Sequence, residues 1–124
     1  MTATSTPLET APAYYKAWTG DAFEHAMTYL ADHVVCETPI GRLEGAAAFR
    51  AFLEPFAQQL IGSSLVAAYG DEDAAMLMYG STTPFVTDLM AAEHMTVRDG
   101  RITRIRLVFD QLPGVEARKA AGIE

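Results

Sequence analysis

The chain has little of what several classes of protein require. Its single cysteine, Cys36, rules out an internal disulfide, so we expect a reducing, cytoplasmic environment. Nine Lys and Arg stand against sixteen Asp and Glu, and the net charge of −7 argues against binding to nucleic acid or to an anionic membrane surface. No apolar run reaches the ~20 residues of a membrane helix. The opening stretch, MTATSTPLET, lacks the basic and apolar regions of a secretory signal.

Motifs that carry chemistry are also scarce. The sequence has no phosphate-binding loop and no nucleophile motif, and neither His25 nor His33 makes a metal-ligand spacing with nearby acids. We therefore expect neither a metal nor another cofactor. What the sequence does have is a globular composition, with half of its residues apolar. Its length predicts a single domain, residues 1–124, with loose tails at about 1–10 and 113–124.

Helical periodicity dominates the first half of the chain. Pro12 suits the first position of a helix that carries Tyr14 and Trp18 on one face. Asp21 with Glu24 has the form of a capping box for a second helix. The apolar stripe of that second helix consists of Phe23, Ala26, Met27 and Leu30. A third helix is predicted from residue 45 to about residue 60, with a proline inside it.

The second half changes to a period of two, which is typical of strands. A short strand at 34–38 ends at Pro39, and Ile40-Gly41 is interpreted as a turn. Four further antiparallel strands are predicted at 65–69, 74–82, 85–97 and 102–110. Three helices followed by strands predict an α+β fold, in which a curved antiparallel sheet wraps around the helices as a cone. Cones of this kind hold ligands at their open end.

The orientation of Glu93 decides which chemistry is available. A two-residue Asp99-Gly100 turn would pair Glu93 with Arg106 and place the apolar rows of the last two strands on opposite faces. A three-residue loop at 98–100 pairs Glu93 with Ile105 and joins the apolar rows, so we expect Glu93 to point inward. The alternative is an outward Glu93 paired with Arg106. An interior carboxyl has a raised pKa, which suits a general base near neutrality or a neutral acid that donates to an oxyanion.

Three segments carry a resemblance to a known family: AWTGDAF, then ETPIGRLEG, then AEHMTVRDGRITRIRLVFD. In order and spacing, residues 13–112 resemble the SnoaL-like branch of the nuclear transport factor 2-like superfamily, which includes ketosteroid isomerases, polyketide cyclases and epoxide hydrolases. The resemblance implies a cofactor-independent enzyme that works on a small apolar molecule. It also implies a homodimer formed through the outer face of the sheet.

Only some of the functional residues of these enzymes have a counterpart in this sequence. Tyr14 takes the position of the oxyanion-hole tyrosine of ketosteroid isomerases, and Glu93 that of their protonated acid. Thr38 stands where those enzymes have their general base, and strand alternation turns the adjacent Glu37 away from the cone. Leu107 occupies the position of the late aspartate of epoxide hydrolases. Steroid isomerisation and epoxide opening of the usual kinds are therefore disfavoured, and Glu93 is left as the candidate proton carrier.

The candidate site has Glu93 and Tyr14 as catalytic residues and an apolar wall. The wall is expected to include Trp18, Met27, Cys36, Thr38, Phe52, Phe56, Met76, Met78, Met95, Leu107 and Phe109. Each of these is equally consistent with an ordinary filled core. His94 is expected on the outer face, opposite Arg104. The leading hypothesis is an isomerase, cyclase or dehydratase for a polyketide-, steroid- or terpenoid-like carbonyl compound. The alternatives are a non-catalytic ligand-binding or dimerisation module and an epoxide hydrolase-like enzyme.

Overall fold

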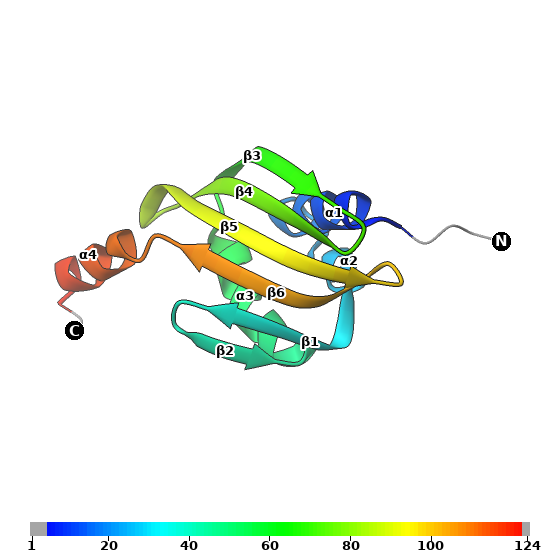
Figure 1. The fold of residues 1–124 in the computed structure, drawn as a ribbon. Helices are drawn as coiled ribbons and strands as arrows, with labels where there is room; N and C mark the ends of the chain where they lie inside the picture. The colour runs from blue at the N-terminus through cyan, green and yellow to red at the C-terminus, as the bar shows by residue number, and fades with distance from the viewer. Residues whose placement is uncertain (1–4, 123–124) are drawn as a thin grey trace.

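The computed structural model describes residues 5–122, which form one curved sheet with helices on one face (Figure 1). The helices are α1 (Pro7–Thr19), α2 (Phe23–Met27), α3 (Ala46–Gln59) and α4 (Leu112–Ala120). The strands are β1 (Leu30–Thr38), β2 (Gly41–Glu44), β3 (Gly62–Gly70), β4 (Ala74–Thr83), β5 (Val86–Arg98) and β6 (Arg101–Phe109). The expected α+β architecture, a curved sheet around three N-terminal helices, is confirmed.

The sheet is mixed, because one of its strand pairs is parallel. Its order is β2-β1-β6-β5-β4-β3, and β1 runs parallel to β6 while the other neighbours are antiparallel. The prediction of a purely antiparallel sheet is therefore wrong at this position. The prediction also missed β2, which follows a turn at Pro39-Ile40 and pairs with β1. A four-residue edge strand with exposed or half-buried side chains has no apolar alternation that would reveal it.

The first helix begins at Pro7, five residues before the predicted start at Pro12. Thr6 forms a capping box with Glu9, in which the Thr6 hydroxyl accepts from the Glu9 N–H and the Glu9 carboxylate accepts from the Thr6 N–H. These bonds satisfy backbone donors that a helix start leaves free. Residues 7–10, expected to be part of a loose tail, are therefore helical.

The second helix is shorter than predicted and lacks the expected cap. Its N-cap residue is Ala22, which makes no side-chain capping bond, so the prediction of a capping box from Asp21 to Glu24 is wrong. The Glu24 carboxylate instead binds the Arg50 guanidinium of α3 (Oε1 to Nη1, 2.8 Å). Leu30, expected on this helix, begins β1. A long-range ion pair has thus replaced the local cap.

The β5–β6 turn corrects the predicted register but keeps the predicted orientation. Asp99 and Gly100 form a two-residue turn with φ of 52° and 75°, the left-handed conformations of a tight hairpin. A bulge at Thr103 then shifts the pairing, so that Glu93 lies opposite Leu107 and not opposite Ile105 as predicted. With a two-residue turn alone, the apolar rows of β5 and β6 would lie on opposite faces of the sheet. The bulge shifts β6 by one residue, so both apolar rows lie on the inner face. His94 pairs with Arg106 for the same reason, and not with Arg104.

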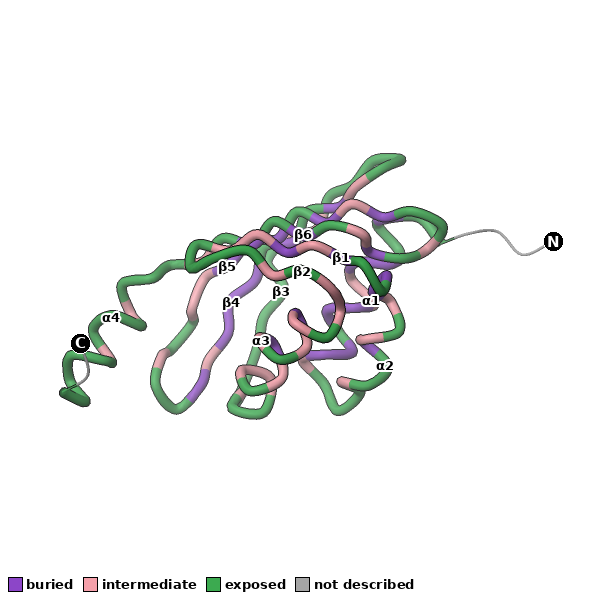
Figure 2. Tube along the Cα trace, turned by 90° about the horizontal axis from the view of Figure 1, so that it is seen from below, coloured by how far each residue is buried: buried purple, intermediate pink, exposed green. Residues whose placement is uncertain are grey.

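Burial follows the two faces of the sheet. Figure 2 shows buried residues along the strands, with α1, α2 and α3 on one side of the sheet. The largest fully buried side chains include Trp18, Tyr14, Phe49, Leu77 and Met95. α4 has no buried residue and extends away from the body of the domain. Within residues 5–122, no helix combines the length and apolarity needed to cross a lipid bilayer.

Candidate functional site

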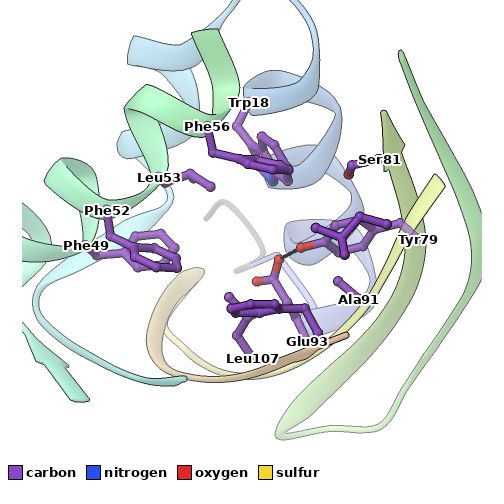
Figure 3. A pocket seen from close by; sticks show the side chains of 12 residues that line it. Trp18, Phe49, Phe52, Leu53, Phe56, Tyr79, Ser81, Ala91, Glu93 and Leu107 are labelled. Atoms are coloured by element: carbon purple, nitrogen blue, oxygen red, sulfur yellow. Dashed lines mark hydrogen bonds between the residues drawn. The ribbon is translucent and has the colours of Figure 1, made fainter. Parts of the chain in front are cut away.

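A cavity of about 300 Å³ lies between the inner face of the sheet and helices α1 and α3. Its wall is aromatic and aliphatic, with few polar groups (Figure 3). It is lined by Trp18, Phe49, Phe52, Leu53, Phe56, Tyr79, Ser81, Leu89, Ala91, Glu93, Leu107 and Phe109. Such a concave apolar site with few polar groups is the usual form of a small-molecule site.

Glu93 lies on the wall of this cavity and is 3 % exposed. It comes from the inner face of β5, where Leu77 of β4 lies directly opposite. Tyr79, two residues further along β4 on the same face, donates its hydroxyl hydrogen to Glu93 Oε1. Oε2 has no hydrogen-bond partner among the described residues and points into the cavity (Figure 3). The carboxyl therefore has one oxygen held by the protein and one open to a ligand.

The surroundings of Glu93 favour the neutral carboxyl. Burial raises its pKa from an ordinary 4.5 to about 7, although the hydrogen bond from Tyr79 acts in the opposite direction. No Lys, Arg or His belongs to the described wall. The alternative of a pair between Glu93 and Arg106 is excluded, because Arg106 lies on the outer face with its Nη2 3.7 Å from Glu37 Oε2. The pKa of Glu93 therefore lies nearer to neutrality than that of an ordinary carboxyl.

The groups around Glu93 stay protonated when it ionises. Burial raises the pKa of Tyr79 and of Tyr14 well above the ordinary value, and the nearby Glu93 raises both further. Burial, with a smaller contribution from Glu93, raises the pKa of Cys36 to about 12. Glu93 is therefore the group in this cluster that exchanges protons near neutrality.

Four further buried polar atoms have no partner in the described part of the chain. They are Thr10 Oγ1, Trp18 Nε1, Ser81 Oγ and the Tyr14 hydroxyl. Trp18 and Ser81 belong to the cavity wall, whereas Tyr14 is fully buried and does not. Unpaired donors in an apolar wall favour a ligand that carries an oxygen acceptor.

The structure places the predicted site residues at four kinds of position. Six predicted site residues line the cavity: Trp18, Phe52, Phe56, Glu93, Leu107 and Phe109. Three are buried behind it: Tyr14, Cys36 and Met95. Met27 and Thr38 lie away from it, and the Thr38 hydroxyl instead binds the Gly41 carbonyl across the β1–β2 turn. The placement of those two residues at the cavity wall was wrong.

Met76 and Met78 were also placed wrongly, on the inner face. They are 47 % and 44 % exposed, because β4 directs its odd positions inward. The inward positions are Ala75, Leu77, Tyr79 and Ser81. All the even residues in 74–78 are apolar too, so the alternation that identifies a half-buried strand is missing there.

Six wall residues were not in the predicted site. They are Phe49, Leu53, Tyr79, Ser81, Leu89 and Ala91. Phe49, Phe52, Leu53 and Phe56 recur at helical spacing in α3, so the sequence carried a signal for Phe49 and Leu53. Tyr79 was detectable only from the correct parity of β4. Within residues 5–122, no group of three or more His, Cys, Asp or Glu side chains is arranged to hold a metal ion.

The chain belongs to the family of SnoaL-like domains, whose sequence model matches residues 11–105. A crystal structure from Kribbella flavida is 50% identical and has a TM-score of 0.91, covering 94% of this chain and 97% of that one. No curated protein matches this sequence.

Two more distant structures show the same fold. An NTF2-like protein of unknown function from Cytophaga hutchinsonii is 17% identical, with a TM-score of 0.76 and coverage of 93% of this chain and 99% of that chain. A second Kribbella flavida protein, provisionally named a ketosteroid isomerase, is 24% identical, with a TM-score of 0.68 and coverage of 86% and 81%. The fold is therefore NTF2-like, and at these identities the likeness extends to the fold alone.

Proposed function

We propose that the protein is a cofactor-independent acid–base enzyme for a small, largely apolar carbonyl compound, with Glu93 as its proton carrier. One observation carries the proposal: an unpaired carboxyl oxygen, Glu93 Oε2, points into an apolar cavity from a group whose pKa is about 7. A general acid or base is most effective when its pKa lies near the working pH. The family relationship to SnoaL-like domains supports an enzyme of this type.

The proposed reaction is proton transfer next to a carbonyl group. Ionised Oε2 removes a proton from the carbon beside the carbonyl, and the protonated carboxyl returns it to another carbon or to a leaving hydroxyl. Tyr79 holds Oε1 throughout, which fixes the direction of the reactive oxygen. The enolate oxygen would accept hydrogen bonds from Trp18 Nε1 or Ser81 Oγ, which line the cavity and have no partner among the described residues. Tyr14, expected to fill this role, is buried behind the wall.

The cavity limits the size of the substrate. A closed apolar cavity of ~150 Å³ holds one benzene molecule. The present cavity is about twice that volume, at about 300 Å³. A compound with one or two rings therefore fits inside, whereas a four-ring steroid would extend through the mouth. We accordingly favour a small cyclic ketone or short polyketide over a steroid.

A non-catalytic ligand-binding module is the second candidate. It is favoured by the absence of a second acidic or basic residue from the described cavity wall. It is favoured also by Thr38, which is bound to the Gly41 carbonyl and cannot act as a base. Such a module would bind the same compounds without turning them over.

A panel of one- and two-ring ketones and enones, with exchange of their α-hydrogens for deuterium followed by NMR, tests the proposal. Loss of the carboxyl in Glu93→Gln should reduce exchange by about 10²–10⁴-fold. Glu72→Gln, which removes an exposed carboxyl that does not line the cavity, should leave exchange unchanged. Equal exchange in both variants would contradict the role of Glu93. Binding without exchange would establish the binding module.

We also propose a cytoplasmic homodimer that pairs through the outer face of the sheet. Met76, Met78 and Val108 leave apolar surface exposed on that face, beside Arg104 and Arg106. Burying such a surface stabilises an association. Sedimentation should give twice the chain mass for the native protein and the chain mass for Met76→Asp, with Glu72→Gln as the control.

A further inference from the structure

The cavity combines aromatic walls with a carboxyl group, and no Lys, Arg or His lines it among the described residues. Half of its twelve lining residues are aromatic. These are Trp18, Phe49, Phe52, Phe56, Tyr79 and Phe109. The face of an aromatic ring carries negative electrostatic potential and attracts a cation placed within about 6 Å of its centre. An apolar cavity built largely from such rings therefore favours a positively charged guest over a negatively charged one.

The rings face the cavity from several directions. Trp18 lies 5.9 Å from Tyr79 between ring centres with an angle of 71° between planes, and 6.2 Å from Phe56 with an angle of 53°. Phe49 and Phe52 lie on the α3 side of the cavity, across from Tyr79 (Figure 3). A guest in the middle is consequently flanked by aromatic rings on more than one side, and a ring that presents its face attracts an ammonium group.

The carboxyl supplies the matching negative charge. Glu93 Oε1 accepts from Tyr79, and Oε2 points into the cavity with no hydrogen-bond partner within residues 5–122. A buried carboxylate with a free oxygen is costly until a cation or a donor reaches it. The arginines of β6 do not supply this cation, because Arg104 and Arg106 face outward and bind Glu37.

We propose that the cavity binds small organic ammonium ions with an apolar body, such as protonated arylalkylamines, with ionised Glu93 as the counter-ion. The ammonium group would donate to Glu93 Oε2, and the apolar body would pack against Phe52, Phe56 and Leu107. The net charge of −7 draws cations toward the protein. Ammonium binding and proton transfer use the same carboxyl, but neither requires the other.

The pH dependence of such binding is set by Glu93 and by the amine. The other titratable groups facing Glu93 are Tyr14 and Tyr15 of α1, Cys36 of β1 and Tyr79 of β4, and each has a raised pKa. These four groups are neutral throughout the range in which Glu93 ionises. With a Glu93 pKa of about 7, its ionised fraction rises about 30-fold between pH 5.5 and pH 8. The affinity for an amine that is still protonated at pH 8 should rise by the same factor.

Isothermal titration calorimetry with 2-phenylethylamine and its neutral analogue 2-phenylethanol tests this directly on the whole chain. We expect the amine to bind about 30-fold more tightly at pH 8 than at pH 5.5. The alcohol should show no such increase. Glu93→Gln should lose the pH dependence of amine binding, because its amide carries no charge. Glu72→Gln removes the same charge from an exposed site and should keep the wild-type profile.

Two results would overturn ammonium binding at this site. One is an amine affinity at pH 8 that does not exceed that of the alcohol. The other is an amine affinity that Glu93→Gln leaves unchanged, which would place the amine on the acidic surface. Neither result bears on α-hydrogen exchange in ketones, so failure here is distinguishable from failure of the proposed enzymatic function. If Glu93→Gln does not fold, the two-pH comparison of amine and alcohol on the native chain still decides.

Discussion

The Tyr79 hydroxyl donates to Glu93 Oε1 from the neighbouring strand, one diagonal step from the directly paired Leu77. Diagonal neighbours on one face of a sheet lie within reach of an aromatic side chain. This bond leaves Oε2 as the carboxyl oxygen without a partner in the described structure. It also lowers the pKa of Glu93, against the larger effect of burial. The reactivity of the carboxyl therefore depends on a residue of another strand.

Replacing Tyr79 by Phe should raise the pKa of Glu93 above about 7, because the bond that favours its ionised form is lost. The titration of the Glu93 side-chain carboxyl carbon by NMR measures this pKa, with Glu93→Gln used to assign the signal. Tyr69→Phe, which changes an exposed tyrosine of β3, should leave the titration unchanged. An unchanged or lower pKa in Tyr79→Phe would contradict the assigned role.

The stability of the protein should fall as pH rises from about 4.5 to about 7 because of Glu93. In that range the folded chain keeps a proton that the unfolded chain has already released, so deprotonation favours unfolding. The effect is complete above about pH 7 and amounts to about 3 kcal/mol, at about 1.4 kcal/mol for each pH unit.

Urea unfolding of the native protein and of Glu93→Gln across this pH range measures the effect. The free energy of unfolding of Glu93→Gln minus that of the native chain should increase by about 3 kcal/mol between pH 4.5 and pH 7.5. Groups common to both chains cancel in the difference. A difference that does not vary with pH would mean that Glu93 ionises in the folded chain as easily as in water.

Filling the cavity should weaken ligand binding without unfolding the protein. Ala91 lines the cavity, so Ala91→Leu places a larger apolar side chain into empty space and should reduce the affinity for 2-phenylethanol at least tenfold. Its free energy of unfolding should change by less than about 1.5 kcal/mol, since the added atoms occupy a void. Ala92→Leu, one residue along on the outer face, is the matched control and should bind as the native chain does. Equal binding by both variants would place the ligand elsewhere.

The start of α1 should depend on its capping box. Thr6→Ala removes the side-chain acceptor of the Glu9 N–H and should lower the free energy of unfolding by about 1 kcal/mol. Chemical denaturation measures the difference, and Ser5→Ala serves as the neighbouring control. Equal stability of the two variants would show that tertiary packing of α1 outweighs its cap.

The inward orientation of Glu93 was predictable from the sequence. Apolar residues at alternate positions of β5 and β6 require a shared inner face, and a carboxyl on that row has to follow it. The α+β fold was predictable for a similar reason, because the change of period from helix to strand is a local property of the chain. The match of residues 11–105 to the SnoaL-like family agrees with that pattern.

The exact register, the partner of Glu93 and the cavity itself depend on the folded chain. The two-residue turn and the bulge at Thr103 together pair Glu93 with Leu107 and not with the predicted Ile105, and no local pattern marks the extra residue of the bulge. Tyr79 reaches Glu93 only because β4 turns its odd positions inward, a choice that its uniformly apolar segment leaves open. Alternation along one strand records which side chains share a face. Contacts between residues far apart in sequence decide which strand supplies a neighbour. They also decide where packing leaves a cavity.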